Sequence, residues 1–171
     1  MRLAAHYSTR SLRSPNPAGS NARRLVLHGD LAAATAVLAG AVQKNPDSVE
    51  ARCAYAGLLW QAGESAAAES MLRTLLACHP QHAAATFLLA KLLEEQARMR
   101  GAEIAVESLF RNVRHPFDTV IQAVELLDEC GRKRAAADLC ENKIAPGTTD
   151  PRLHACAGTL DMQVGRFERA R

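Results

Sequence analysis

Two apolar runs separated by a short polar break recur along most of this chain. The stretch from Asn45 to Pro80, NPDSVEARCAYAGLLWQAGESAAAESMLRTLLACHP, shows the arrangement, with Gly63 between its runs and Pro46 near its start. Aromatic residues make up only 4% of the chain, and the residue types that favour strands are sparse. Small side chains, mostly Ala, fill the runs instead. The pattern therefore predicts helices connected by short turns, and an all-α protein.

The spacing of the breaks predicts an internal repeat. Pro46 and Pro80 are 34 positions apart, and we call this spacing the repeat interval. Five glycines could each separate one helix from the next, and successive glycines are 34, 38, 30 and 34 positions apart. They are Gly29, Gly63, Gly101, Gly131 and Gly165. Because the two deviations cancel around Gly101, we expect a displaced, longer loop (QARMRG) in the third unit and an intact repeat elsewhere.

Small residues recur at fixed distances from these glycines. Five positions after a glycine stand Ala34, Ala68, Ala136 and Ala170, and seven positions before one stand Ala22, Ala56, Val124 and Gly158. Two helices of a hairpin cross at an interaxial distance of roughly 8–10 Å, which a large side chain at the crossing would exceed. These positions therefore predict the crossing points of successive helix hairpins.

Period, glycine, alanine and proline together resemble the tetratricopeptide repeat, a helix-turn-helix unit of about 34 residues. The Trp and Tyr of its strongest consensus are missing. The resemblance covers residues 18–171 and implies a right-handed superhelix (an α-solenoid) of antiparallel helix hairpins, about four and a half units long. Proline ends the second helix of a unit, and we expect His79 and His115 to stabilise helix C-termini beside Pro80 and Pro116.

The resemblance also implies that five positions of each first helix face a concave groove. In this sequence those positions are Glu50, Cys53, Gly57, Trp60 and Gln61, then Ala84, Phe87, Lys91, Glu94 and Glu95, then Asp118, Ile121, Glu125, Asp128 and Glu129, and finally Arg152, Ala155, Thr159, Met162 and Gln163. Seven acids stand in this set against Lys91 and Arg152.

From that set we predict a groove for a basic or amphipathic peptide or helix, anchored near Trp60 and Phe87. The candidate binding residues are Glu50, Trp60, Phe87, Lys91, Glu94, Glu95, Ile121, Glu125, Asp128 and Glu129. In the alternative, both aromatic residues pack between helices and the acids are simply solvated. The Lys/Asn clamp with which chaperone-binding members hold a terminal carboxylate is not present, so a chaperone adaptor is disfavoured.

Charge is unevenly distributed. The net charge is +3, but Arg2, Arg10, Arg13, Arg23 and Arg24 all precede the first acid, and the remainder holds 16 basic and 18 acidic residues. We expect residues 1–17 to form a basic, disordered arm, although their composition faintly resembles a transit peptide. An acidic groove would repel phosphate, which disfavours nucleic acid as a partner. No apolar run is long enough to cross a membrane, and we expect a cytoplasmic protein.

Candidate chemistry is sparse. The sequence has no phosphate-binding glycine loop, nucleophile elbow or zinc pattern, so we expect no catalytic residue, cofactor or metal within this chain. His79 and His82 straddle a proline, which disfavours a metal site. The five cysteines are Cys53, Cys78, Cys130, Cys140 and Cys156. Because no two have C-x-x-C spacing and each falls in an apolar stretch, we expect free, buried thiols.

The last residues, VGRFERAR, open a second helix of a fifth unit, so we expect an array truncated in that unit. Two functions stay open on the sequence. The first is a scaffold that binds a protein or peptide partner, with possible self-association through the terminal hairpin. The second is the non-catalytic repeat region of a larger transferase, because Ala- and Leu-rich arrays of this kind resemble those that precede sulfotransferases and glycosyltransferases.

Overall fold

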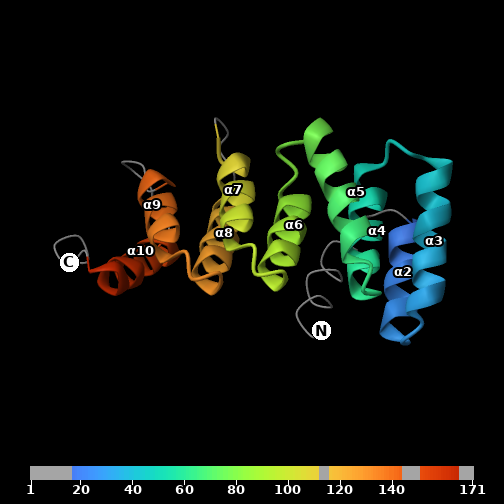
Figure 1. The fold of residues 1–171 in the computed structure, drawn as a ribbon, viewed down its shortest axis with the longest axis horizontal. Helices are drawn as coiled ribbons and strands as arrows, with labels where there is room; N and C mark the ends of the chain where they lie inside the picture. Colours follow the sequence, from blue (N-terminus) through green and yellow to red (C-terminus); the bar gives the residue numbers. More distant parts are fainter. Residues whose placement is uncertain (1–16, 112–115, 144–150, 166–171) are drawn as a thin grey trace. The chain divides into compact units, whose positions relative to one another are not determined.

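The computed structural model describes residues 17–111, 116–143 and 151–165, and within these ranges the secondary structure is α-helical without strands. The all-α solenoid of helix hairpins that the repeat predicts is confirmed (Figure 1). The chain divides into two compact units, Met1–Leu92 and Leu93–Arg171. The helices are α2 (Pro17–Leu27), α3 (Leu31–Lys44), α4 (Val49–Gln61), α5 (Ser65–Cys78), α6 (Ala83–Glu95), α7 (Met99–Leu109), α8 (Phe117–Glu129), α9 (Lys133–Lys143) and α10 (Pro151–Val164).

The repeat interval is uniform along these helices. The first helices α4, α6, α8 and α10 begin at Val49, Ala83, Phe117 and Pro151, each one repeat interval after the last. The second helices α3, α5, α7 and α9 begin at Leu31, Ser65, Met99 and Lys133, again one repeat interval apart. Helix α2 begins at Pro17, so only residues before it could form the predicted arm, and those lie outside the described residues.

The predicted longer loop of the third unit is wrong. Gly101 lies inside α7, and the turn residue is Ala97, which has a positive φ of 58°. The turn glycines Gly63 and Gly131 have φ values of 88° and 70° and stand one repeat interval before and after Ala97. Alanine adopts this left-handed conformation only at a cost in energy, whereas glycine does so freely. The glycine pattern misplaced the turn because this unit keeps the conformation without the glycine.

Once the third turn is placed at Ala97, small residues occur at the same positions of every unit. We call such a set of equivalent positions a column. Ala34, Ala68, Ala102 and Ala136, five positions after each turn, are all 0% exposed. Seven positions before the turns, the buried residues are Ala22, Ala56, Ala90 and Val124. Larger side chains form two further buried columns at the same interval. These are Leu38, Leu72, Val106 and Cys140 in second helices, and Leu58, Leu92, Leu126 and Leu160 in first helices.

In the first unit, the core joins three consecutive helices. Ala22 of α2, Ala34 and Leu38 of α3, and Ala54 and Leu58 of α4 form one buried cluster. Figure 1 shows α2, α3, α4 and α5 as successive antiparallel neighbours, and α4 packs on α5. Each hairpin presents an apolar face that the following hairpin covers, which is how repeat proteins acquire a core.

Polar side chains cap the N-termini of several of these helices. The Asp30 carboxylate accepts a hydrogen bond of 2.9 Å from the Ala33 N–H at the start of α3, and Ser48 begins α4 in the same way. His82 stands one repeat interval after Ser48 and begins α6, because its Nδ1 accepts a hydrogen bond of 3.1 Å from the Ala85 N–H. A side chain that satisfies these free N–H groups stabilises the first turn of a helix. The sequence reading missed this role of His82.

The second unit packs α8 against α9 and α9 against α10, with α7 against α8. Gly101 of α7 lies close to the preceding helix, because a Cβ added there would stand 3.4 Å from a Leu93 methyl carbon. A methyl group at this position would be in ordinary van der Waals contact with Leu93, and the equivalent residues one repeat interval away are Ala67 and Ala135. Of the two histidines expected at helix C-termini, His79 is the C-cap residue of α5, and His115 lies outside the described residues.

Candidate interaction surfaces

Three of the ten predicted binding residues are buried. Trp60 of α4 and Phe87 of α6 are each 5% exposed, and Lys91 of α6 is 3% exposed. None of the three presents a surface to a partner in this structure. The burial of Trp60 and Phe87 favours the alternative in which both aromatic residues pack between helices, and their role as peptide anchors stays a prediction. Removing a large apolar side chain from water is favourable, so Trp60 and Phe87 stabilise the fold by packing in the core.

The predicted acids lie closer to solvent. Glu50 of α4, Glu95 of α6, and Glu125 and Glu129 of α8 are exposed, whereas Glu94, Ile121 and Asp128 are half-buried. A further acid of the predicted groove set has a cationic partner: Asp118 of α8 forms an ion pair with Arg152 of α10, at 3.0 Å between Oδ1 and a guanidinium nitrogen.

One surface of the second unit gathers several of these acids. Helix α8 carries Ile121, Glu125, Asp128 and Glu129, and it is in contact with α10. On α10, Met162 stands one repeat interval after Asp128 and is 53% exposed. We call Ile121, Glu125, Asp128, Glu129 and Met162 the acidic face. It combines carboxylates with an exposed apolar side chain, a composition that suits an amphipathic partner.

The electrostatics across α8 and α10 are consistent with a shared surface. Besides burial, the negative charge of Glu125 on α8 raises the pKa of the Cys156 thiol on α10. One carboxylate oxygen of Asp128, Oδ1, is buried without a hydrogen-bond partner among the described residues. Asp128 and Glu129 also occupy the last turn of α8, which contains no basic residue. A helix C-terminus carries partial negative charge, so acids there are locally unfavourable and a cation would stabilise them.

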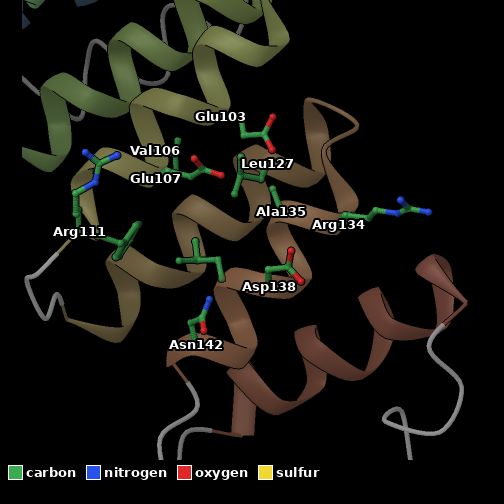
Figure 2. Close-up of a pocket in the computed structure, with 11 residues that line it drawn as sticks. Glu103, Val106, Glu107, Arg111, Leu127, Arg134, Ala135, Asp138 and Asn142 are labelled. Atoms are coloured by element: carbon green, nitrogen blue, oxygen red, sulfur yellow. The ribbon is translucent and has the colours of Figure 1, made fainter.

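A separate hollow of about 560 Å³ lies among α7, α8 and α9 (Figure 2). Apolar side chains form part of its lining, with the Glu107 and Asp138 carboxylates between two arginines. Figure 2 shows Arg111 and Arg134 at opposite ends, pointing away from one another. The lining residues are Glu103, Val106, Glu107, Phe110, Arg111, Leu127, Arg134, Ala135, Asp138, Leu139 and Asn142. Sequence reasoning missed this hollow, because second helices form most of it and the predicted groove lies on first helices.

Comparison with known proteins also indicates a helical repeat. Residues 25–92 match the family model described as Tetratricopeptide repeat. The matched segment comprises 68 of the 171 residues. The segment ends where the first compact unit ends. No curated protein matches this sequence.

Solved structures extend the fold beyond the matched tetratricopeptide repeat segment. The crystal structure of MamA is 16% identical, with 87% of each chain covered and a TM-score of 0.60. A thermophilic tetratricopeptide repeat protein from Thermus thermophilus is 20% identical, with 95% of this chain and 86% of that chain covered and a TM-score of 0.57. PilF from Pseudomonas aeruginosa is 16% identical, with 98% and 73% covered and a TM-score of 0.61. At these identities the likeness establishes the fold. None of the three is described as a sulfotransferase or glycosyltransferase, so the predicted association with such enzymes gains no support.

The cysteines of the tetratricopeptide repeat fold differ in exposure. Cys53, Cys130 and Cys140 are buried and Cys156 is half-buried, but Cys78 is exposed, which corrects the expectation of five buried thiols. Cys78 is the last residue of α5, three positions after Leu75, the last buried residue of that helix. Burial, followed by the nearby charge of Glu50, raises the pKa of the Cys53 thiol to about 12. A thiol with so high a pKa is protonated at neutral pH and is a poor nucleophile.

The described residues were also compared with the requirements of a metal site and of a membrane-spanning helix. Within residues 17–111, 116–143 and 151–165, no group of three or more His, Cys, Asp or Glu side chains is placed to hold a metal ion. Among the helices that the structure describes, none is both long and apolar enough to cross a membrane.

Proposed function

We propose that this chain is a protein-interaction scaffold that binds a basic, amphipathic segment of a partner on the acidic face of α8 and α10. The observation that carries the proposal is that Glu125 and Glu129 of α8 and Met162 of α10 are all exposed, on two helices that are in contact. Arg152 of α10 pairs with Asp118, an acid of α8 that lies outside the acidic face. The tetratricopeptide repeat fold supports the scaffold role, since stacked hairpins form extended surfaces.

The local charge arrangement favours a cationic partner. Glu125 and Glu129 are four positions apart on α8, and like charges at this spacing destabilise a helix by about 0.2–0.5 kcal/mol. Asp128 and Glu129 add to this because they lie at the negative end of the helix dipole. A lysine or arginine bound between them relieves both repulsions. Met162 offers an apolar contact for the other side of an amphipathic segment.

The proposal is tested with a labelled amphipathic peptide of lysine and leucine, and fluorescence anisotropy at low salt. We expect the double variant Glu125→Gln/Glu129→Gln to bind it about tenfold more weakly, because two exposed charge pairs contribute up to about 1 kcal/mol each. Removing two like charges from one helix should leave its stability equal or slightly higher. Weaker binding with an unchanged melting temperature would then report on the surface and not on unfolding.

The matched control is Asp47→Asn/Glu64→Gln, which removes two negative charges from exposed positions in the first unit. It should retain wild-type affinity. If both double variants weaken binding equally, the peptide responds to net charge alone and the acidic face is not the site. If neither does, the acids of α8 are merely solvated.

A further inference from the structure

The second unit carries another surface, of opposite charge, at the start of α9. A hollow of about 510 Å³ is lined there by Arg132, Lys133 and Arg134, with Glu103 of α7 and Gln163 of α10. We call it the basic groove. Three cations therefore face one carboxylate, and that carboxylate already has a partner, because Arg132 forms an ion pair with Glu103. Within the described part of the chain, no ion pair occupies the charges of Lys133 and Arg134.

Both of these cations reach solvent. The side chains of Lys133 and Arg134 are exposed, and Figure 2 shows Arg134 extending outward from α9, away from Asp138 and Glu107. The outward direction matters because an inward arginine would be neutralised by those carboxylates. The two cations therefore form the open, positively charged part of the basic groove.

The position of these charges is unusual for a helix start. The first turn of α9 contains no acid, and its cations stand at the positive end of the helix dipole, where positive charge is disfavoured. In the first unit, the positions equivalent to Lys133 and Arg134 carry no charge, and the residue just before the helix, equivalent to Arg132, is an acid. Asp30 precedes α3 and Glu64 precedes α5, whereas Arg98 precedes α7 and Arg132 precedes α9. The fold therefore tolerates either charge at this edge and does not itself require the cations.

We propose that the basic groove is a docking surface for an acidic, carboxylate-rich segment of a protein partner, separate from the acidic face. Charge complementarity selects this occupant. Carboxylates at the groove would pair with Lys133 and Arg134 and would also offset the positive end of the α9 dipole. Because Arg132 is engaged with Glu103, it fixes the wall of the groove, and Lys133 and Arg134 make the contacts.

The test uses the full chain and a labelled ten-residue glutamate-rich peptide, measured by fluorescence anisotropy over a range of salt concentrations. We expect Lys133→Gln/Arg134→Gln to weaken binding by about tenfold at low salt. The same variant should melt at or above the wild-type temperature, because it removes disfavoured cations from a helix N-terminus. Loss of binding without loss of stability separates a docking role from a structural one.

The matched control is Arg10→Gln/Arg13→Gln, which removes two positive charges from the N-terminal segment and should bind the peptide like the wild type. The proposal is overturned if the control loses affinity and the α9 variant does not. Equal affinity for a single-stranded oligonucleotide would assign a general polyanion surface instead. Self-association of the protein that disappears in the α9 variant would assign the groove to a second copy of this chain.

Discussion

The turn at Ala97 provides the most direct test of the repeat register. Ala97 is exposed and has a φ of 58°, so its Cβ is strained in a conformation that glycine adopts freely. Left-handed backbone costs a non-glycine residue about 1–2 kcal/mol. Glycine loses about 0.4–1 kcal/mol more through the greater freedom of its unfolded chain. Because no packing contact is at stake at an exposed site, Ala97→Gly should stabilise the protein by a net of about 0.5–1 kcal/mol.

This difference is measurable by thermal unfolding followed by circular dichroism at the helix band. For a chain of this size, about 1 kcal/mol corresponds to about 2–4 °C in melting temperature. Ala62→Gly serves as the control, because Ala62 is also exposed at the end of a first helix but has an ordinary φ of −73°. The control should lower the melting temperature. If Ala97→Gly lowers it as much as Ala62→Gly does, Ala97 is not left-handed and the uniform register is wrong.

Two further predictions concern packing and pH. Ala102→Leu should destabilise the protein by about 1–3 kcal/mol in urea unfolding, because Ala102 is 0% exposed at a helix crossing, whereas Ile104→Leu at a 53% exposed site of the same helix should be nearly neutral. Equal effects of the two variants would contradict the crossing. Burial lowers the pKa of His82 below its ordinary value of 6.5. The negative charge of Glu50 opposes this shift, and the charge of His79 adds to it. The folded state thus binds fewer protons, so the contribution of His82 to stability is complete above about pH 6.5 and is lost as the pH falls toward its folded pKa. The urea midpoint should accordingly drop between neutral and mildly acidic pH, and less steeply in His82→Asn, which keeps an N-capping oxygen; identical slopes would exclude His82 as the source.

Much of the architecture follows from local preferences that are visible in the sequence. Small residues at fixed distances from turns predict where helices cross, and glycine at Gly63 and Gly131 marks turns because it alone adopts positive φ without strain. The third turn escaped this reasoning, since Ala97 takes the same conformation with the wrong residue type. A comparison of Ala columns instead of glycines would have found it, because Ala102 stands one repeat interval after Ala68.

The exposure of the candidate binding residues could not be predicted from the sequence, because it depends on how the helices pack against one another. Trp60 and Phe87 have the right register for a groove, but burial is decided by which neighbouring helices cover them, and both are covered. The pairing of Asp118 with Arg152 likewise joins residues one repeat interval apart, on helices that meet only after folding. The sequence determined the period, the helices and the acidic character of α8, because these rest on local conformation and residue type. Only the tertiary structure decided which side chains remain exposed, which charges are neutralised and where the cations of α9 open onto a groove, because each of these depends on contacts between helices.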